Sequence, residues 1–193
     1  MSPRILVLYG TTDGHTAKVA DAIAAALRAH DADVDLAHAG GTWDPDPRDY
    51  AAVIVAASVH AGTYQRPVRR WARAHAAALG ERPTAFVSVC LAVLNRTDRV
   101  NKDLAAILDR FTAETAWQPT ETKVVAGALK FTKYGWLKRW MMRRIVAKAG
   151  GDTDTSRDYE YTDWKDLEEF VARFSDHLSD WRTHEDAHHA VLL

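Results

Sequence analysis

Three threonines, an aspartate, a glycine and a histidine follow the first apolar run of the chain, in the sequence TTDGHT (residues 11–16). A turn from a strand into a helix directs backbone N–H groups toward one point, and the helix N-terminus favours negative charge there. Gly14 permits close approach of a ligand, whereas Asp13 would repel an anion unless it turned away and capped the helix. We therefore expect a phosphate site formed by Thr11, Thr12, Asp13, Gly14, His15 and Thr16.

This turn is not specific by itself. It lacks the Lys-Ser/Thr pair of a Walker A loop and the spaced glycines of a dinucleotide-binding fingerprint. A plain strand-to-helix connection also uses threonine, aspartate and glycine for turn and cap chemistry, so both interpretations remain open at this point.

Two further loops narrow the choice of ligand. The segment SVHAGTYQRP (residues 58–67) follows the third expected strand, and VCLAVLNRTD (89–98) follows the fourth. Small residues in the first segment let backbone amides approach a planar ring, and Tyr64 is available to stack or hydrogen-bond. One loop for a phosphate and two for a ring predict a mononucleotide site, which a flavin with a single phosphate fits better than a dinucleotide.

The elements expected to position these loops alternate between strands and helices. Continuous apolar runs predict buried strands, and an alternating run at 32–38 predicts an edge strand. Helical spacing of apolar residues predicts the connecting helices, one of which begins after an Asp163 cap. The expected strands are 5–9, 52–57, 85–90 and 124–129, and the expected helices are 16–30, 67–79, 100–112 and 163–178. This order predicts a doubly wound α/β domain with a parallel sheet and helices on both faces.

Composition bounds the domain organisation and the classes of site. The 193 residues predict a single domain over 1–183, and the last residues, 184–193, predict a flexible tail. One cysteine excludes an internal disulfide or a thiolate metal site, and the nine histidines show no metal-ligand spacing, so no metal is expected. The start lacks the pattern of a signal peptide, and no apolar stretch is long enough to span a membrane, so we expect a cytoplasmic protein.

Seven sequence blocks carry a resemblance to known proteins. They are LYGTTDGHT, ASVHAGTY, AFVSVCL, WQP, VVAGALKFTKYGW, GGDTDT and YTDW, and they occur in this order between residues 8 and 164. The chain resembles the flavodoxin-like proteins, and most closely the menaquinone-dependent protoporphyrinogen IX dehydrogenase family. The resemblance implies a five-stranded parallel sheet of order 2-1-3-4-5 with FMN at the strand ends.

The resemblance also implies roles for residues of the three loops. Residues 11–16 would hold the phosphate, and residues 126–129, Gly127 among them, would approach the edge of the ring. The ring would be flanked by Ser58, Val59, His60, Ala61, Gly62, Tyr64, Cys90, Leu91, Ala92 and Asn95. His15 and His60 could hydrogen-bond the flavin or meet a propionate. Residues 91–95 include no aromatic side chain of the kind that stacks on the ring in flavodoxins, which argues against a simple one-electron carrier. No catalytic acid or base is named, because the flavin performs the redox chemistry.

The segment 130–151 is unusually basic and aromatic in a chain whose net charge is −1. Residues 130–149 contain seven Lys or Arg and no acid. A helix with a cationic side and a Trp/Leu/Met side is typical of an interfacial membrane helix. Two alternatives remain: the apolar stripe packs on the domain, or the patch binds nucleic acid, for which no recognised motif is present. Residues predicted for substrate or membrane contact are His60, Lys130, Lys133, Trp136, Lys138, Arg139, Trp140 and Arg143.

The predicted function is an FMN-dependent oxidoreductase of heme biosynthesis. Electrons would pass from protoporphyrinogen IX through FMN to menaquinone or another membrane quinone, with the protein peripheral on an anionic inner membrane face. The alternatives are a flavodoxin-type electron carrier, a quinone reductase with another donor, or a flavin-free interaction module. The sequence leaves the actual donor and acceptor and the oligomeric state open.

Overall fold

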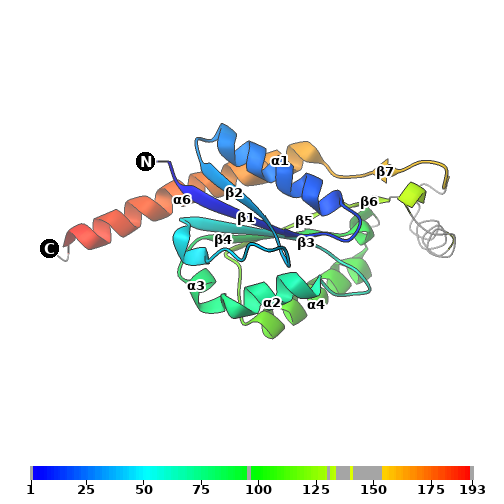
Figure 1. Ribbon diagram of the computed structural model, residues 1–193, viewed down its shortest axis with the longest axis horizontal. Coiled ribbons are helices and arrows are strands. Elements are labelled where there is room, and N and C mark those ends of the chain that lie inside the picture. The colour runs from blue at the N-terminus through cyan, green and yellow to red at the C-terminus, as the bar shows by residue number, and fades with distance from the viewer. Residues whose placement is uncertain (1, 95–96, 130, 134–139, 141–153, 192–193) are drawn as a thin grey trace.

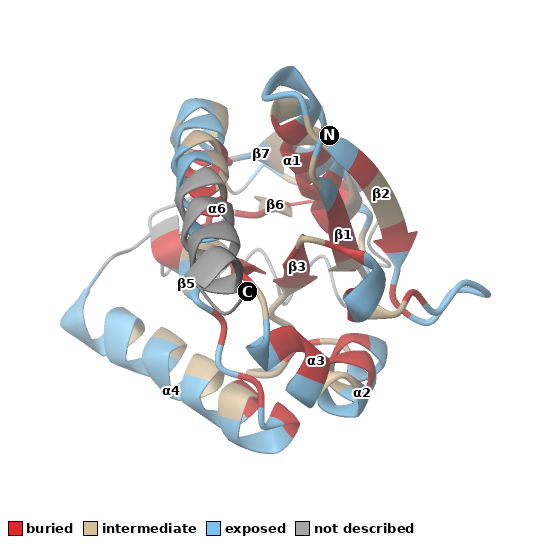
Figure 2. Ribbon diagram, turned by 90° about the vertical axis from the view of Figure 1, so that its left-hand side faces the viewer, coloured by how far each residue is buried: buried red, intermediate tan, exposed pale blue. Residues whose placement is uncertain are grey.

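Five parallel strands form the central sheet of the computed structural model, which describes residues 2–94, 97–129, 131–133, 140 and 154–191 (Figure 1). Their order is β2-β1-β3-β4-β5, which confirms the predicted fold and places the expected edge strand at the edge. The strands are β1 (Arg4–Gly10), β2 (Asp33–His38), β3 (Ala52–Ser58), β4 (Thr84–Val89) and β5 (Glu121–Val125). Residues of β1, β3 and β4 are almost entirely buried, because helices cover both faces of the sheet (Figure 2).

Helices on the two faces bury separate clusters of apolar side chains. One face is covered by α1 (His15–Ala29) and α6 (Trp164–Val191), where Ile23 and Phe174 share a buried cluster. The other face is covered by α2 (Arg66–Ala74), α3 (Ala76–Gly80) and α4 (Asp98–Thr115), with Phe86 and Trp117 in its cluster. Short 3₁₀ turns occur at Pro47–Asp49, Leu91–Leu94 and Phe131–Lys133.

Two helices differ from their predicted bounds. The helix expected at 67–79 is interrupted at His75, whose φ of −111° and ψ of 15° are not helical, and Leu79 is buried beyond the break. Helix α6 begins after Asp163, whose carboxylate accepts from the Asp166 N–H as predicted for a cap, at 3.1 Å. It does not end near residue 178 but continues through Val191, into the segment expected to be a flexible tail. No glycine or proline occurs after residue 163 to end the helix.

The strand expected at 124–129 is divided between two sheets. Strand β5 ends at Val125, and β6 (Ala128–Leu129) pairs antiparallel with β7 (Tyr159–Glu160). The division follows from the hydrogen bonds of the intervening turn: the Thr162 hydroxyl donates to the Ala126 carbonyl at 2.6 Å, and the Tyr161 N–H donates to the Gly127 carbonyl at 3.2 Å. The turn carbonyls therefore bond to residues 161–162 and the chain leaves the main sheet.

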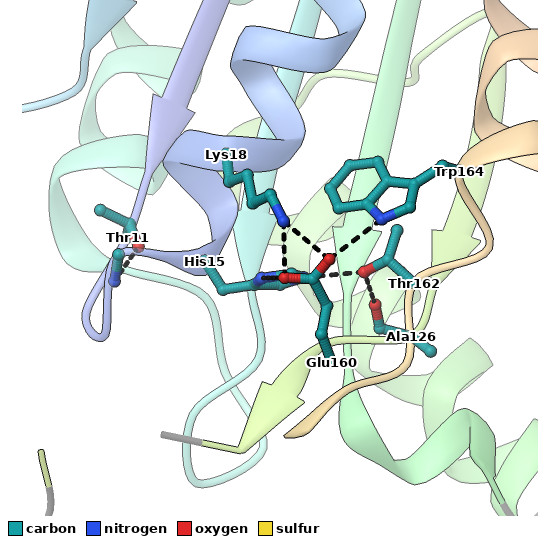
Figure 3. Close-up of polar contacts among 8 residues, drawn as sticks. Thr11, His15, Lys18, Ala126, Glu160, Thr162 and Trp164 are labelled. Carbon is teal, nitrogen blue, oxygen red and sulfur yellow. Dashed lines mark hydrogen bonds and ion pairs between the residues drawn. The ribbon is translucent and has the colours of Figure 1, made fainter. Parts of the chain in front are cut away.

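Polar contacts fasten β7 to the first helix. The Lys18 ammonium lies 2.8 Å from both carboxylate oxygens of Glu160, and the Trp164 indole N–H donates to the same carboxylate at 3.0 Å (Figure 3). Lys18 also lies 4.9 Å from the centre of the Trp164 ring, within the range of a cation–π contact. The hydrogen bond from Lys18 is the main cause that holds the pKa of Glu160 below its ordinary value. These contacts attach the small two-stranded β6–β7 sheet to α1.

We expect Glu160→Gln to lower the free energy of unfolding at neutral pH by about 0.5–1 kcal/mol, as for a partly exposed ion pair. A carboxylate whose pKa is depressed in the fold stabilises above its unfolded pKa, and the stabilisation is lost as the pH falls through the folded pKa. The difference between wild type and variant should therefore close between about pH 5 and about pH 3. Chemical denaturation across this range measures it.

Glu169→Gln is the matched control, because Glu169 pairs with Lys165 on the same helix but both side chains are largely exposed. Its effect should be smaller at every pH. A Glu160→Gln difference that stays constant down to the lowest pH would contradict the stabilising role of the charge.

Gly10 is the position at which β1 turns toward residues 11–16, and a side chain there has no room. A Cβ on Gly10 would lie 2.4 Å from Cγ2 of Val68, which is fully buried and β-branched. We expect Gly10→Ala to lower the free energy of unfolding by about 1–3 kcal/mol through overpacking. Gly80→Ala, where the added Cβ would meet nothing within 4 Å, should be neutral or stabilising. Equal thermal or chemical stability of the two variants would disprove the close approach of β1 and α2.

Candidate functional site

The loops that follow β1, β3 and β4 meet the turn that follows β5 around one cleft. Ligands of open α/β sheets bind at this carboxyl edge of the strands. The side chains and backbone that line the cleft belong to Thr11, Asp13, His15, Thr16, Ser58, Val59, His60, Ala61, Val89, Cys90, Leu91, Ala92, Gly127 and Ala128. Most of the residues predicted to contact a cofactor are therefore brought together.

The turn before α1 has the features of an anion site. Gly14 adopts a φ of +88°, in the left-handed region that glycine favours, and its N–H donates to the Thr11 hydroxyl at 2.9 Å. The N-cap residue is Gly14, which has no side chain, and the described first turn of α1 contains no acidic residue. Asp13 lines the cleft beside this turn. The α1 N-terminus therefore presents backbone N–H groups at the cleft, next to one carboxylate.

The second wall is a tight turn after β3. His60 and Thr63 exchange two backbone hydrogen bonds of 2.8 and 3.1 Å, and the two residues between them have positive φ, 48° at Ala61 and 75° at Gly62. This is the geometry of a type I′ turn, which presents backbone instead of bulky side chains. The Gln65 amide donates to the hydroxyls of Ser58 and Thr12 and so ties this wall to the first turn.

The third wall is apolar and made of small groups. It is formed by the end of β4 with the 3₁₀ turn Leu91–Leu94, and by Gly127 and Ala128 beyond β5. Burial raises the pKa of the Cys90 thiol, so the thiol stays protonated at neutral pH and is not a reactive thiolate. No Phe, Tyr or Trp is among the described residues that line the cleft. This wall has room for a planar ring, and none of its described residues has an aromatic side chain that could stack on that ring.

Some predicted residues do not reach the cleft. Tyr64 is buried in the core, where its hydroxyl donates to Ser88 at 2.9 Å and its ring packs edge-on against Phe86 and Phe111, so it cannot stack on a ligand in the cleft. Thr12, Gly14 and Gly62 shape the turns but do not line the cleft, and Asn95 lies outside the described residues. Ala128 lies in the range 126–129 that was expected at the cofactor edge, whereas sequence reasoning missed Val89, which adjoins the predicted Cys90.

The basic aromatic segment is only partly described. Among its predicted contact residues, Trp140 is 54% exposed and Lys133 ends a 3₁₀ turn. Phe131 is fully buried beside Leu129, in the apolar cluster next to the small β6–β7 sheet. Lys130, Trp136, Lys138, Arg139 and Arg143 lie outside the described residues, so their role stays a prediction. Within the described ranges, no helix is long and apolar enough to cross a membrane, and no three metal-ligating side chains are grouped.

A buried relay connects the phosphate turn to the turn after β5. His15 Nε2 lies 2.7 Å from the Thr162 hydroxyl, and that hydroxyl donates to the Ala126 carbonyl at 2.6 Å (Figure 3). A carbonyl only accepts, so the single Thr162 proton is used there and Nε2 must carry the proton that it donates to Thr162. The other ring nitrogen, Nδ1, lies 3.9 Å from a Glu160 oxygen. Sequence reasoning assigned no role to Thr162, although the block YTDW that contains it was noted.

Comparisons with known proteins identify the family of the chain. Residues 6–156 match the family model of the flavodoxin domain. The chain is 32% identical over 177 residues to the protoporphyrinogen IX dehydrogenase (quinone) of Escherichia coli strain K12, covering 92% of this chain and 97% of that protein. It is 30% identical over 177 residues to the Leishmania major protein of the same name, covering 90% of this chain and 75% of that one.

Solved structures agree on the fold. The flavodoxin of Streptococcus pneumoniae TIGR4 matches with a TM-score of 0.54 at 15% identity, covering 92% of this chain and 98% of that chain. Oxidised Flavodoxin 1 of Bacillus cereus matches with a TM-score of 0.52 at 14% identity, covering 90% and 98%. The chain therefore belongs to the flavodoxin-domain family and, within it, groups with the protoporphyrinogen IX dehydrogenases, as its sequence blocks predicted.

Proposed function

We propose that this chain is an FMN-dependent oxidoreductase that oxidises protoporphyrinogen IX and passes the electrons to a quinone. The observation that carries the proposal is the cleft itself, with an anion site at one end and a flat, apolar slot at the other. This division matches the phosphate and the ring of FMN. The names of relatives at 32% and 30% identity supply the substrate and the acceptor class.

The residues of the cleft fit FMN in a defined orientation. The hydroxyls of Thr11 and Thr16 and the N-terminus of α1 would hold the phosphate, since these donors lie at the cleft, and the Asp13 carboxylate, which also lines it, would turn away from the anion. Residues 58–61 and 90–92 would flank the ring, with Gly127 at its edge. FMN, when bound, supplies the acceptor for a hydride equivalent, and the protein supplies position and electrostatics. The protonated Cys90 thiol takes no part in electron transfer.

The composition of the ring walls favours an enzyme over an electron carrier. The described lining has no aromatic side chain to cover the ring, and Tyr64, the one candidate for stacking, is held in the core. A ring face that the protein leaves uncovered is accessible to a planar substrate. An electron carrier, in contrast, needs only an exposed ring edge.

Access to a membrane quinone is assigned to the basic aromatic segment at residues 130–149. Seven cationic residues without an acid would be attracted to anionic headgroups, each by about 1 kcal/mol near the surface. The large aromatic residues among them are of the kind that anchor at the bilayer interface. In the sequence the segment directly follows β6, whose residue Ala128 lines the cleft beside Gly127. The protein would therefore be peripheral on an anionic membrane face.

The oxidoreductase proposal predicts three observations on one purified sample. The protein should be yellow and release FMN on heating, anaerobic protoporphyrinogen IX should bleach the flavin absorption, and a quinone should restore it. Dithionite serves as the control reductant. A flavin that dithionite bleaches but the porphyrinogen leaves oxidised would disprove the substrate and favour a carrier or a reductase with another donor. A protein that binds no flavin would disprove the whole proposal.

The membrane proposal is tested by co-sedimentation with vesicles of phosphatidylglycerol and phosphatidylcholine. The protein should pellet with these vesicles, less at high salt, and replacement of Lys138, Arg139 and Arg143 by alanine should weaken binding by at least tenfold. Replacement of Arg66, Arg70 and Arg73 on α2 by alanine removes the same charge elsewhere and is the control. Equal loss in both triple variants would show that net charge, and not this segment, determines binding.

A further inference from the structure

Hydrogen bonds of a side chain outside the cleft connect two of its walls, the start of α1 and the turn after β5. We propose that Thr162, together with His15, is a positioning residue that holds the Ala126–Gly127 turn against the start of α1 and so sets how tightly FMN is bound. The proposal rests on FMN binding in the cleft, as proposed above. It assigns a role in the cofactor site to a residue 147 positions away from the phosphate turn in sequence.

The relay reaches both ends of the ligand without Thr162 touching it. His15 is the first residue of α1, where the phosphate would bind, and it lines the cleft. Gly127, next to Ala126, lines the opposite end, at the predicted ring edge. Thr162 is not among the lining residues, but its hydroxyl joins the two ends through one accepted and one donated hydrogen bond. Its effect on FMN must therefore pass through the position of the two walls.

Burial makes the relay difficult to replace with water. The exposed fraction is only 6% for His15 and 8% for Thr162. If the Thr162 hydroxyl is removed, the buried Nε2–H of His15 and the part-buried carbonyl of Ala126 both lose their partner. The buried Nε2–H can find a new partner only if the turn moves, and such a movement separates the two walls.

Side chains of β7 and α6 lie around the other side of the histidine ring. The Glu160 carboxylate lies 3.9 Å from His15 Nδ1, which is beyond hydrogen-bond distance. Lys18 and Trp164 hold that carboxylate in place. The Trp164 ring also lies at a centroid distance of 6.1 Å from the imidazole. Residues of α1, β7 and α6 therefore surround the relay (Figure 3).

The test compares FMN dissociation constants of flavin-free protein, measured by quenching of FMN fluorescence, for Thr162→Val and Thr162→Ser. Valine keeps the shape of threonine and loses the hydroxyl, whereas serine keeps the hydroxyl. We expect Thr162→Val to weaken FMN binding about tenfold and to shift the visible flavin band, and Thr162→Ser to stay within about twofold of wild type.

Thermal unfolding of each flavin-free variant shows whether it is folded. Should Thr162→Val fail to fold, the same comparison is made with His15→Gln, whose amide N–H can replace Nε2–H, against His15→Leu, which has no donor. Glutamine should retain binding and leucine should lose it. The double variant His15→Leu/Thr162→Val should bind no more weakly than either single variant, because both break one relay.

Four results would overturn the inference. A folded Thr162→Val protein that binds FMN as wild type does, with an unshifted band, removes the positioning role. Equal losses in Thr162→Val and Thr162→Ser, or additive losses in the double variant, show that packing and not the hydrogen-bonded relay matters. In these three cases wild type still binds FMN and the proposed function stands. Failure of wild type itself to bind FMN overturns both the inference and the proposed function.

Discussion

The cleft depends on the register of the parallel strands, which brings their carboxyl ends into line along one edge of the sheet. Gly10 at the end of β1 lies beside Ala57, Ser58 at the end of β3 lies beside Val89, and Val89 lies beside Val125 at the end of β5. The strands therefore end within a residue of one another along the same edge. Because each following turn starts at that level, residues from four distant parts of the sequence meet around one ligand-sized space. The register of the buried apolar strands thus determines where the site lies.

Backbone hydrogen bonding explains where the strands of the main sheet end. The ladder extends one residue past the strands, since the Val59 N–H donates to the Val89 carbonyl at 2.9 Å and the Cys90 N–H to the Val125 carbonyl at 3.0 Å. Beyond β5 no further strand is present in the described part of the sheet, so the next two carbonyls need other partners. The Thr162 hydroxyl and the Tyr161 N–H supply them. The segment before α6 therefore supports the last wall of the site from outside the cleft and is not only a connection.

The sequence predicts the sheet well, because its strands are covered on both faces and read as continuous apolar runs. The apolar run at 124–129 is misleading, because it belongs to two separate apolar clusters. Val125 packs in the cluster of the main sheet, and Leu129 packs beside Phe131 in the cluster of the small β6–β7 sheet. An apolar run indicates that a segment is buried but not which element it packs against. Tyr64 fails for a related reason, since its position in a loop says nothing of the direction of its ring. The His15–Thr162 bond pairs two residues 147 positions apart, and no local pattern encodes such a pair.

The two ends of the cleft meet different physical demands. A phosphate must exchange its hydration for fixed donors, and the start of α1, whose described first turn contains no acid, offers backbone N–H groups. A ring that reacts in turn with a donor and an acceptor needs a face that the protein does not cover. Small side chains, two turn residues with positive φ and a glycine at the edge would meet that demand, because they shape the slot mainly with backbone. Rigidity must then come from outside the slot, where the buried His15–Thr162 hydrogen bond and the exposed contacts of Glu160 with Lys18 and Trp164 lie. Support placed there would hold the walls without covering a bound ring, which suits the proposed catalytic function better than the storage of a single electron.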